Sequence, residues 1–414
     1  MLSVDDLFKG RHFDREIIVL YVRWYLRYKL SFRDLVEMMT ERGLSLAHTT
    51  IMRWVQRYVP EFEKRWNRFA RRAGGWWRVD ETYVKIKGRW VYLYRAVDKA
   101  GKTVDFLLRA KRDAAAAKAF FRRAFARHGR PPRKITLDGY QASHRAAREL
   151  LAQHRGGART RIRSSKWLCR EFFSRGRVGS MIAGRGRRNR VMIDFKGSHF
   201  ERDVILWSVR WYVAYPMSYR QLEEMMEERG VDVDHSTLDR WVVKYAPLLE
   251  KQFRARKRAI GSSWRLDETY VKVKGCWKYL YRAVDKAGAT VDFLLTAKRD
   301  RKAALRFLRK AIGQHGKPEK ITIDKSGANT AAIESYNAEH EADIEIRRIK
   351  YLNNIVEQDH RAVKRVTRPM LGFKSFRSAA ATLSGIELMH MSRKDQLQTR
   401  GELRPAQQFY ALAA

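Results

Sequence analysis

The sequence contains a long stretch of itself twice. Residues 77–113 and residues 264–300 are identical at 31 of 37 positions, at a constant separation of 187 residues. The same separation aligns Trp54 with Trp241. Solenoid and propeller repeats have periods of about 20–50 residues, so this much longer period indicates a duplicated multi-domain unit. We therefore expect two copies of one architecture in a single chain.

The two copies differ toward their ends. Beyond Asp138 they drift apart, and the first copy runs into residues 155–190, which hold 11 Arg, one Lys, six Gly and a single Glu. This stretch has no clear hydrophobic period, so we interpret it as a basic linker. The predicted segments are a helical region at 1–70, an incomplete domain at 71–154, the linker at 155–190, a second helical region at 191–258, a complete domain at 259–400 and a tail at 401–414.

Each copy opens with a region predicted to be helical. In the first copy, apolar residues recur at helical spacing, and Gly43 and a short second helix near 49–58 follow. The second copy repeats this pattern around Gly230, with a short helix near 236–245. Two short helices joined by a Gly-containing turn are typical of a helix-turn-helix, although an ordinary helical hairpin has the same pattern. The residues expected to face the major groove are Thr50, Arg53 and Arg57 in the first copy, and Thr237, Arg240 and Lys244 in the second. Trp54 and Trp241 are interpreted as core residues.

The charge of the chain indicates a polyanionic partner. Lys and Arg number 87 against 45 Asp and Glu, which gives a net charge of +42. Self-repulsion of this size would oppose a compact fold unless a partner such as double-stranded DNA neutralises it. No stretch resembles a membrane-spanning helix, and two cysteines are too few for a disulfide framework or a Cys-rich zinc site. We expect a cytoplasmic, nucleoid-associated protein.

After each helical region the hydrophobic period shortens to about two residues. In the second copy, residues 264–273, 277–284 and 290–295 are predicted as three successive strands. Asp285 lies in a turn sequence, and Asp300 precedes a helical run whose N-terminus it is expected to cap. We interpret both acids as structural.

Three other acids lie where a sheet and a helix can bring them together. Asp267 lies within the first of these strands among apolar neighbours, where a buried unpaired charge is costly. Asp324 ends a further apolar strand, and Glu357 lies on a helix predicted over 351–366. Converging carboxylates raise each other's pKa unless cations neutralise them, and oxygen ligands suit Mg²⁺ or Mn²⁺ better than zinc. Two such ions can activate an attacking oxygen and stabilise a leaving oxygen at a phosphodiester.

Three sequence blocks of the second copy resemble the signature blocks of the insertion-sequence 6 family of bacterial transposases. In chain order they read WRLDETYVKVKGCWKYLYRAVDKAG, ITIDKSGANTAAI and KYLNNIVEQDHRAVKRVTRPMLGFKSF. The resemblance covers about 195–397, and the first copy to about residue 166. It implies an α/β fold with an RNase H-like, integrase-like catalytic domain behind an N-terminal helix-turn-helix, the whole unit duplicated here with its first copy truncated.

The resemblance also implies a site and a reaction. A DDE triad with divalent metal falls on Asp267, Asp324 and Glu357. The implied reaction is strand cleavage at terminal inverted repeats, followed by attack of a 3′-hydroxyl on target DNA. Because transposases bring two DNA ends together, the resemblance further implies at least a dimer.

Basic residues follow Glu357 on its predicted helix. Arg361, Lys364 and Arg365 lie one to two turns later, so some of them share the face of Glu357. We interpret them as phosphate contacts, the alternative being that they only solvate the helix. His360 is interpreted as a surface histidine.

The first copy retains only part of this pattern. Asp80 and Asp138 match Asp267 and Asp324, but the position of Glu357 falls on Phe173, two residues from Glu171. The first copy is thus predicted to hold a relict site without catalytic activity, and its final strand and helix are expected to be absent or replaced.

Two other functions fit the same residues. The fusion could be a DNA-binding protein with impaired catalysis, or an RNase H-like nuclease that cuts DNA without joining it. The complete triad and its flanking block in the second copy favour the transposase.

Overall fold

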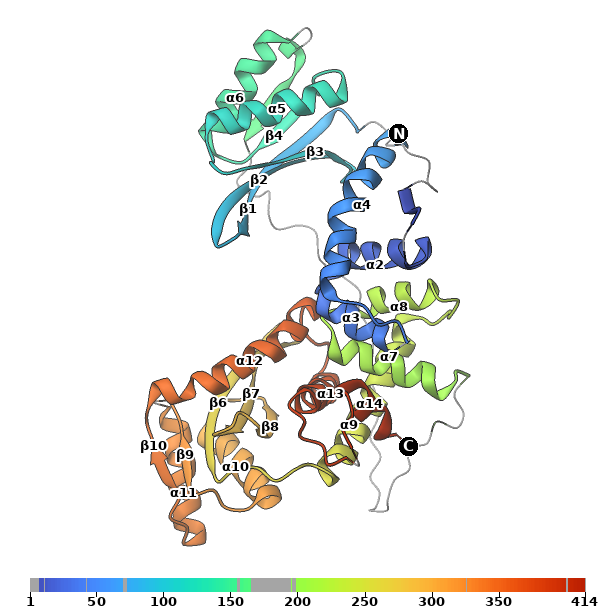
Figure 1. Ribbon diagram of the computed structural model, residues 1–414. Helices are drawn as coiled ribbons and strands as arrows, with labels where there is room; N and C mark the ends of the chain where they lie inside the picture. The colour runs from blue at the N-terminus through green and yellow to red at the C-terminus, as the bar shows by residue number, and fades with distance from the viewer. Residues whose placement is uncertain are drawn as a thin grey trace. The chain divides into compact units, whose positions relative to one another are not determined.

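The computed structural model describes residues 7–10, 12–41, 43–69, 73–154, 157–164, 195, 199–324, 326–399 and 401–413. The chain divides into two compact units, one of Met1–Val59 with Arg187–Ala414 and one of Pro60–Gly186 (Figure 1). Within the described ranges, no helix combines the length and the apolar character needed to cross a membrane.

The unit Pro60–Gly186 holds a five-stranded mixed sheet in the order β3-β2-β1-β4-β5. Its strands are β1 (Trp76–Ile86), β2 (Arg89–Asp98), β3 (Thr103–Arg109), β4 (Lys134–Leu137) and β5 (Arg161–Ser164). The first three strands pair antiparallel, whereas β4 pairs parallel with β1 and β5 pairs parallel with β4. Helices α5 (Ala114–His128) and α6 (Gln141–Gln153) bury their apolar residues with those of the sheet in one core.

The fifth strand corrects two expectations. We expected the final strand of the first copy to be absent or replaced and residues 155–190 to be a basic linker. Instead, the 3₁₀ helix Gly157–Arg159 is followed by β5, which belongs to the first sheet. Strand β5 pairs with β4 through Arg161, Ile162, Arg163 and Ser164. The remainder of the predicted linker lies outside the described residues.

The second copy repeats the sheet in the order β10-β9-β6-β7-β8. Its strands are β6 (Ser263–Val273), β7 (Cys276–Asp285), β8 (Thr290–Thr296), β9 (Lys320–Thr322) and β10 (Glu345–Arg347). Asp285 accepts backbone hydrogen bonds from Ala287 and Ala289 at 2.9 Å each, and Asp300 accepts one from Ala303 at 2.8 Å. The predicted turn and N-cap roles of these two acids are thereby confirmed.

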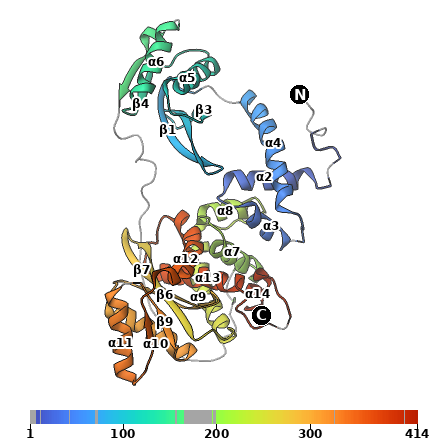
Figure 2. The same ribbon diagram turned by 60° about the vertical axis from the view of Figure 1, so that its left-hand side comes forward.

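Helices cover both faces of the second sheet. On one face α10 (Arg301–His315) and α11 (Gly327–His340) share a core with Trp264, Leu266 and Tyr281. On the other face lie α12 (Asn354–Thr367) and α13 (Phe376–Arg393), and Arg282 of β7 reaches Glu387 of α13 (Figure 2). The expected mixed α/β class is confirmed.

The two helical regions have the same plan. They consist of α2 (Arg15–Arg27), α3 (Phe32–Thr40) and α4 (His48–Phe69) in the first copy, and of α7 (Arg202–Ala214), α8 (Tyr219–Glu227) and α9 (His235–Ala255) in the second. Ser31 and Ser218 cap α3 and α8 with full capping boxes. Gly43 and Gly230 have φ of 77° and 73°, a left-handed conformation that glycine adopts without strain. The helices after the turn were predicted to be short, but α4 and α9 have 22 and 21 residues.

The end of the chain folds onto the second helical region. Helix α14 (Pro405–Ala411) buries Ala406 and Phe409, so the predicted tail 401–414 is in part a packed helix. Helix α13 packs so closely on α7 and α9 that a Cβ on Gly385 would lie 2.6 Å from a methyl of Val213. The predicted boundary at residue 258 therefore divides elements that pack together as one unit.

Candidate active site

The second copy brings its three predicted carboxylates into one electrostatic neighbourhood. Asp267 lies in the middle of β6, Asp324 follows β9, and Glu357 lies in the first turn of α12. Strand β9 pairs parallel with β6, and α12 packs across β6 and β7. Since β9 runs parallel to the start of β6, its C-terminal end delivers Asp324 beside Asp267.

Asp267 is the carboxylate most altered by its surroundings. Its side chain is 18% exposed, and burial raises its pKa to about 7. A hydrogen bond from the backbone of Glu268 lowers the pKa, while the charges of Glu268, Asp324 and Glu357 raise it further. Perturbation by burial together with like charges is typical of functional sites.

An arginine that sequence reasoning missed lies beside this cluster. Arg299 forms ion pairs with Glu268 at 3.1 Å and with Asp324 at 3.5 Å. Glu268 is 3% exposed, and burial raises its pKa despite the guanidinium of Arg299. Both residues occur in the repeated segment of each copy, which was the available signal.

A buried ionic network fixes the helix of Glu357 to the sheet. Arg282 of β7 is fully buried and pairs with Glu387 of α13 at 2.6 Å and with Asp359 of α12 at 2.7 Å. Asp359 also pairs with His390 and Lys394, at 2.6 Å each. Because Asp359 lies two residues after Glu357, the network determines where α12 holds that carboxylate.

His360 corrects a sequence interpretation. It is 4% exposed rather than on the surface, and its Nδ1 lies 3.5 Å from Oδ2 of Asp267. Burial and the charges of Arg282 and Lys364 lower its pKa to about 3, so the imidazole is neutral at physiological pH. The spacing of His360 from buried Val356 and Val363, four residues before and three after it, was the signal that places it on the inner face of α12.

The donor set suits a hard divalent cation. Carboxylate oxygens are the ligands preferred by Mg²⁺ and Mn²⁺, and the raised pKa of Asp267 shows that its ionised form lacks compensating positive charge. Within the described residues, no group of three or more His, Cys, Asp or Glu side chains is arranged as a formed metal site. The chemistry of the residues fits the metal, and the charges of Asp324 and Glu357 act on Asp267.

The described part of the first copy holds two of the three carboxylate positions of this site. Arg112 pairs with Glu81 at 2.8 Å and with Asp138 at 3.0 Å, as Arg299 does in the second copy. Burial and the charge of Asp138 raise the pKa of Asp80. Phe173 and Glu171, at and near the position of Glu357, lie outside the described residues.

The predicted DNA-facing residues lie at the start of the long helices α4 and α9. Arg53, Arg57, Arg240 and Lys244 are exposed, and Thr50 and Thr237 are half-buried. Arg240 donates a hydrogen bond to Thr237 at 2.7 Å. Trp54 and Trp241 are 8% and 7% exposed, which confirms them as core residues.

The three basic residues after Glu357 differ in their surroundings. Arg361 is exposed, and Lys364 is half-buried. Arg365 forms an ion pair with Asp34 of the first helical region, so it is engaged within the protein. Phosphate contact by Arg365 would therefore require that ion pair to open.

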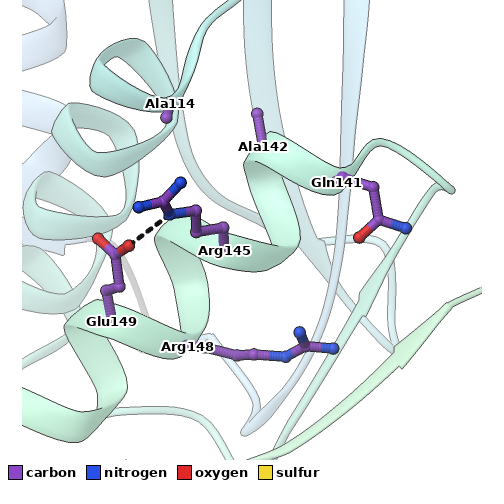
Figure 3. A pocket seen from close by; sticks show the side chains of 6 residues that line it. All are labelled: Ala114, Gln141, Ala142, Arg145, Arg148 and Glu149. Carbon is purple, nitrogen blue, oxygen red and sulfur yellow. Dashed lines mark hydrogen bonds and ion pairs between the residues drawn. The ribbon is translucent and has the colours of Figure 1, made fainter.

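A surface pocket lies away from these carboxylates. It is in the first copy, where α6 meets the start of α5, and neither Asp80 nor Asp138 lines it (Figure 3). Arg145 and Glu149 pair across one turn of α6 at 2.8 Å. The lining residues are Ala114, Gln141, Ala142, Arg145, Arg148 and Glu149.

Comparison with known proteins identifies the family. A family model described as "DDE domain" matches residues 75–172 and 261–396, which is more than half of the chain. The chain belongs to the insertion-sequence 6 family of DDE transposases. The predicted family is thus confirmed, and the match covers both copies. A model of the "Transposase IS66 family" also matches residues 201–317.

Curated relatives agree with this DDE transposase assignment. The transposase for the insertion sequence-like element IS431mec of Staphylococcus aureus (strain Mu50) is 40% identical over 201 residues, or 47% of this chain and 87% of the relative. The transposase for element IS257 in transposon Tn4003 of Staphylococcus aureus gives the same identity and coverage. One relative thus corresponds to about half of this chain, as expected for a tandem DDE transposase.

Solved structures of integrases are distant matches. The simian T-cell lymphotropic virus intasome is 17% identical, covering 37% of this chain and 56% of that chain, with a TM-score of 0.27. The HTLV-2 integrase catalytic core domain in complex with magnesium, in its trimeric form, is 16% identical, covering 38% and 86%, with a TM-score of 0.23.

Proposed function

We propose that this transposase cleaves DNA at the terminal inverted repeats of an insertion sequence and joins the ends to target DNA at Asp267, Asp324 and Glu357. The observation that carries the proposal is the placement of the three acids: β9 pairs parallel with β6, and α12 packs against β6. The charges of Asp324 and Glu357 accordingly help to raise the pKa of Asp267. Asp267 on β6, Asp324 after β9 and Glu357 on α12 supply the carboxylate oxygens that suit Mg²⁺ or Mn²⁺.

The metal ions, held by these three carboxylates, would lower the pKa of the attacking water or 3′-hydroxyl and stabilise the leaving oxygen at the phosphodiester. The protein's own residues prepare the site for them. Burial and the charges of Asp324 and Glu357 disfavour the ionised form of Asp267, and the neutral ring of His360 does not offset that charge. Arg299 offsets the charge of Glu268 and also pairs with Asp324.

Double-stranded DNA is the proposed partner of the basic surface. Arg53, Arg57, Arg240 and Lys244 are exposed on α4 and α9 and would contact the terminal repeats. Arg361 and Lys364 follow Glu357 on α12 and would contact phosphates near the reacting bond, whereas Arg365 would do so only after releasing Asp34. We further propose that the chain acts on the bacterial nucleoid in the cytoplasm and assembles with other copies to hold two DNA ends.

A strand-transfer assay tests this function. The full chain, labelled transposon-end DNA and a plasmid target are incubated with Mg²⁺, with Mn²⁺ or with a chelator. Joined product should form with either ion and not with the chelator. Glu357→Gln should reduce it by about 10³-fold, the scale of losing a group that stabilises the transition state. Glu339→Gln, which alters an exposed acid on α11, is the matched control and should retain product.

The other outcomes identify the competing functions. Cut DNA without joined product would indicate a nuclease. Tight DNA binding with neither cleavage nor joining under any metal would indicate a DNA-binding fusion with impaired catalysis. Either result would overturn the proposed strand transfer.

A further inference from the structure

The two helical regions contact each other through reciprocal ion pairs. Arg23 of α2 pairs with Glu224 at 3.2 Å and with Glu228 at 2.6 Å in the second copy. Arg210 of α7 pairs with Glu37 at 2.8 Å and with Glu41 in the first copy. Adding 187 to Arg23, Glu37 and Glu41 gives Arg210, Glu224 and Glu228. Each of these ion pairs therefore has an equivalent in which the roles of the two copies are exchanged.

The centre of this contact is a residue that meets its own equivalent. Trp24 and Trp211, again 187 positions apart, pack edge to face with ring centroids 5.7 Å apart and an interplanar angle of 86°. Both indoles are fully buried. A position that meets its own counterpart lies close to an approximate two-fold axis, so the tryptophan pair lies near the axis that relates the two regions. Helices α2 and α3 lie beside α7 and α8 in both Figure 1 and Figure 2.

Reciprocal contacts around a self-contact are the signature of an isologous interface, in which one surface patch pairs with an identical patch. We infer that this face is a homodimerisation surface whose partner is a second copy of the same helical unit. In the second copy the face consists of Trp211, Arg210, Glu224 and Glu228, and in the first copy of their counterparts. In this chain the first copy supplies that partner within the same molecule.

The pairing is more deeply buried on one side of the axis. Arg210 is fully buried, whereas the side chain of Arg23 is 51% exposed. Elements near the C-terminus, which are described only for the second copy, account for this. Tyr410 of α14 donates a hydrogen bond to Glu41 at 3.1 Å, and Arg393 of α13 lies 3.5 Å from Glu37. These contacts add to the pairing of Arg210 with the first copy.

Charge reversal of one face in the full chain tests the inference. In the variant Arg23→Glu, Glu37→Arg, Glu41→Arg, the first face has reversed charges and the second face is unchanged. Pairing within the chain then places like charges together. Pairing between chains joins the first face of one chain to the first face of another, and the second face to the second face. Both of these pairings place opposite charges together. Sedimentation should show this variant at twice the wild-type mass or more, increasingly with concentration.

Two further variants make the test specific. Reversing both faces, by adding Arg210→Glu, Glu224→Arg and Glu228→Arg, should restore pairing within the chain and the wild-type mass. The matched control Arg33→Glu with Arg220→Glu alters two equivalent exposed arginines outside the contact and should keep the wild-type mass. A three-residue variant that stays at the wild-type mass would overturn the inference, and so would a six-residue variant that keeps the raised mass.

If the three-residue variant does not fold, the exposed pair still gives an answer. Arg23→Ala, Glu228→Ala and the double variant are compared by urea unfolding of the full chain. Non-additive effects on unfolding would support the contact between the copies, and strictly additive effects would overturn it.

Discussion

The two sheets of this chain have nearly the same sequence and the same strand order but different surroundings. Phe293 and Leu295 of β8 are each 7% exposed, whereas their counterparts Phe106 and Leu108 of β3 are 43% and 44% exposed. Arg282 is fully buried in its ionic network, whereas the equivalent Arg95 is exposed. The strand order is therefore encoded in the repeated segment, while burial of its outer face depends on α12 and α13.

The same difference separates the two sites. Both copies hold an arginine between a glutamate and an aspartate, and both raise the pKa of the central aspartate. A helix carrying the third carboxylate is described only in the second copy, where the charge of Glu357 acts on Asp267. A site of this kind is thus completed by the helix that covers the sheet.

The largest expected difference in stability concerns the equivalent arginines. Arg282→Leu leaves Glu387 and Asp359 without their buried partner, so it should lower the free energy of unfolding by about 3–5 kcal/mol. Arg95→Leu changes an exposed side chain and should cost about 0.5 kcal/mol or less. Urea unfolding of both full-length variants measures the contrast, and equal losses would show that both sheets are covered alike.

A smaller contrast is expected at the equivalent phenylalanines. Phe293→Ala should cost about 3 kcal/mol because it opens a cavity between β8 and its covering layer. Phe106→Ala removes a ring that is already 43% exposed, so about 1 kcal/mol is expected. Thermal unfolding of the two variants tests this. A larger loss for Phe106→Ala would refute the difference in burial.

The raised pKa of Asp267 predicts a stabilising active-site variant. The carboxyl of an unfolded Asp has a pKa near 3.9, whereas that of folded Asp267 is raised to about 7. The stability contributed by the neutral form of Asp267 is therefore fully present below about pH 4. It is lost as the pH rises through 7. Asp267→Asn keeps a neutral side chain at every pH. In chelator at pH 8 it should therefore be more stable than wild type by roughly 2 kcal/mol, an advantage that shrinks as pH falls toward 4.

Melting temperatures from pH 4 to 8, with and without Mg²⁺, check this prediction. Bound Mg²⁺ should narrow the difference in melting temperature between Asp267→Asn and wild type at pH 8, because the ion stabilises the ionised wild-type site. A pH-independent difference would mean that Asp267 does not titrate in this range.

The smallest expected effect concerns the arginines beside each site. Arg299→Gln leaves Glu268 and Asp324 without their shared cation, so strand transfer should fall about 10-fold, the scale of a residue that orients metal ligands. Arg112→Gln makes the same change in the first copy and should leave the rate unchanged. Equal losses for the two variants would give the first site a part in the reaction.

The sequence predicted the parts of the site that local pattern determines. Asp267 within a strand, Asp324 at a strand end and Glu357 on a helix all lie on the expected elements, because strand and helix periods were clear there. The structural roles of Asp285 and Asp300 followed from turn and capping chemistry in the same way.

The remainder depends on tertiary contacts. Strand β5 has one apolar residue, Ile162, and is defined by pairing with β4 rather than by its own pattern. His360 was interpreted as a surface residue, but it lies on the same inward side of α12 as the buried Val356 and Val363. That side is buried by packing of the helix on the sheet. The pairing of Arg23 with the second copy joins residues about 200 positions apart, and no local pattern encodes such a distance.

The central claim is that the chain has one working catalytic site, in its second copy. The most direct measurement compares Mg²⁺-dependent strand transfer by full-length Asp267→Asn and Asp80→Asn. These variants make the same change at equivalent positions of two similar sheets. The account predicts that Asp267→Asn loses activity by about 10³-fold and that Asp80→Asn stays within about twofold of wild type. Comparable losses in both variants would contradict it.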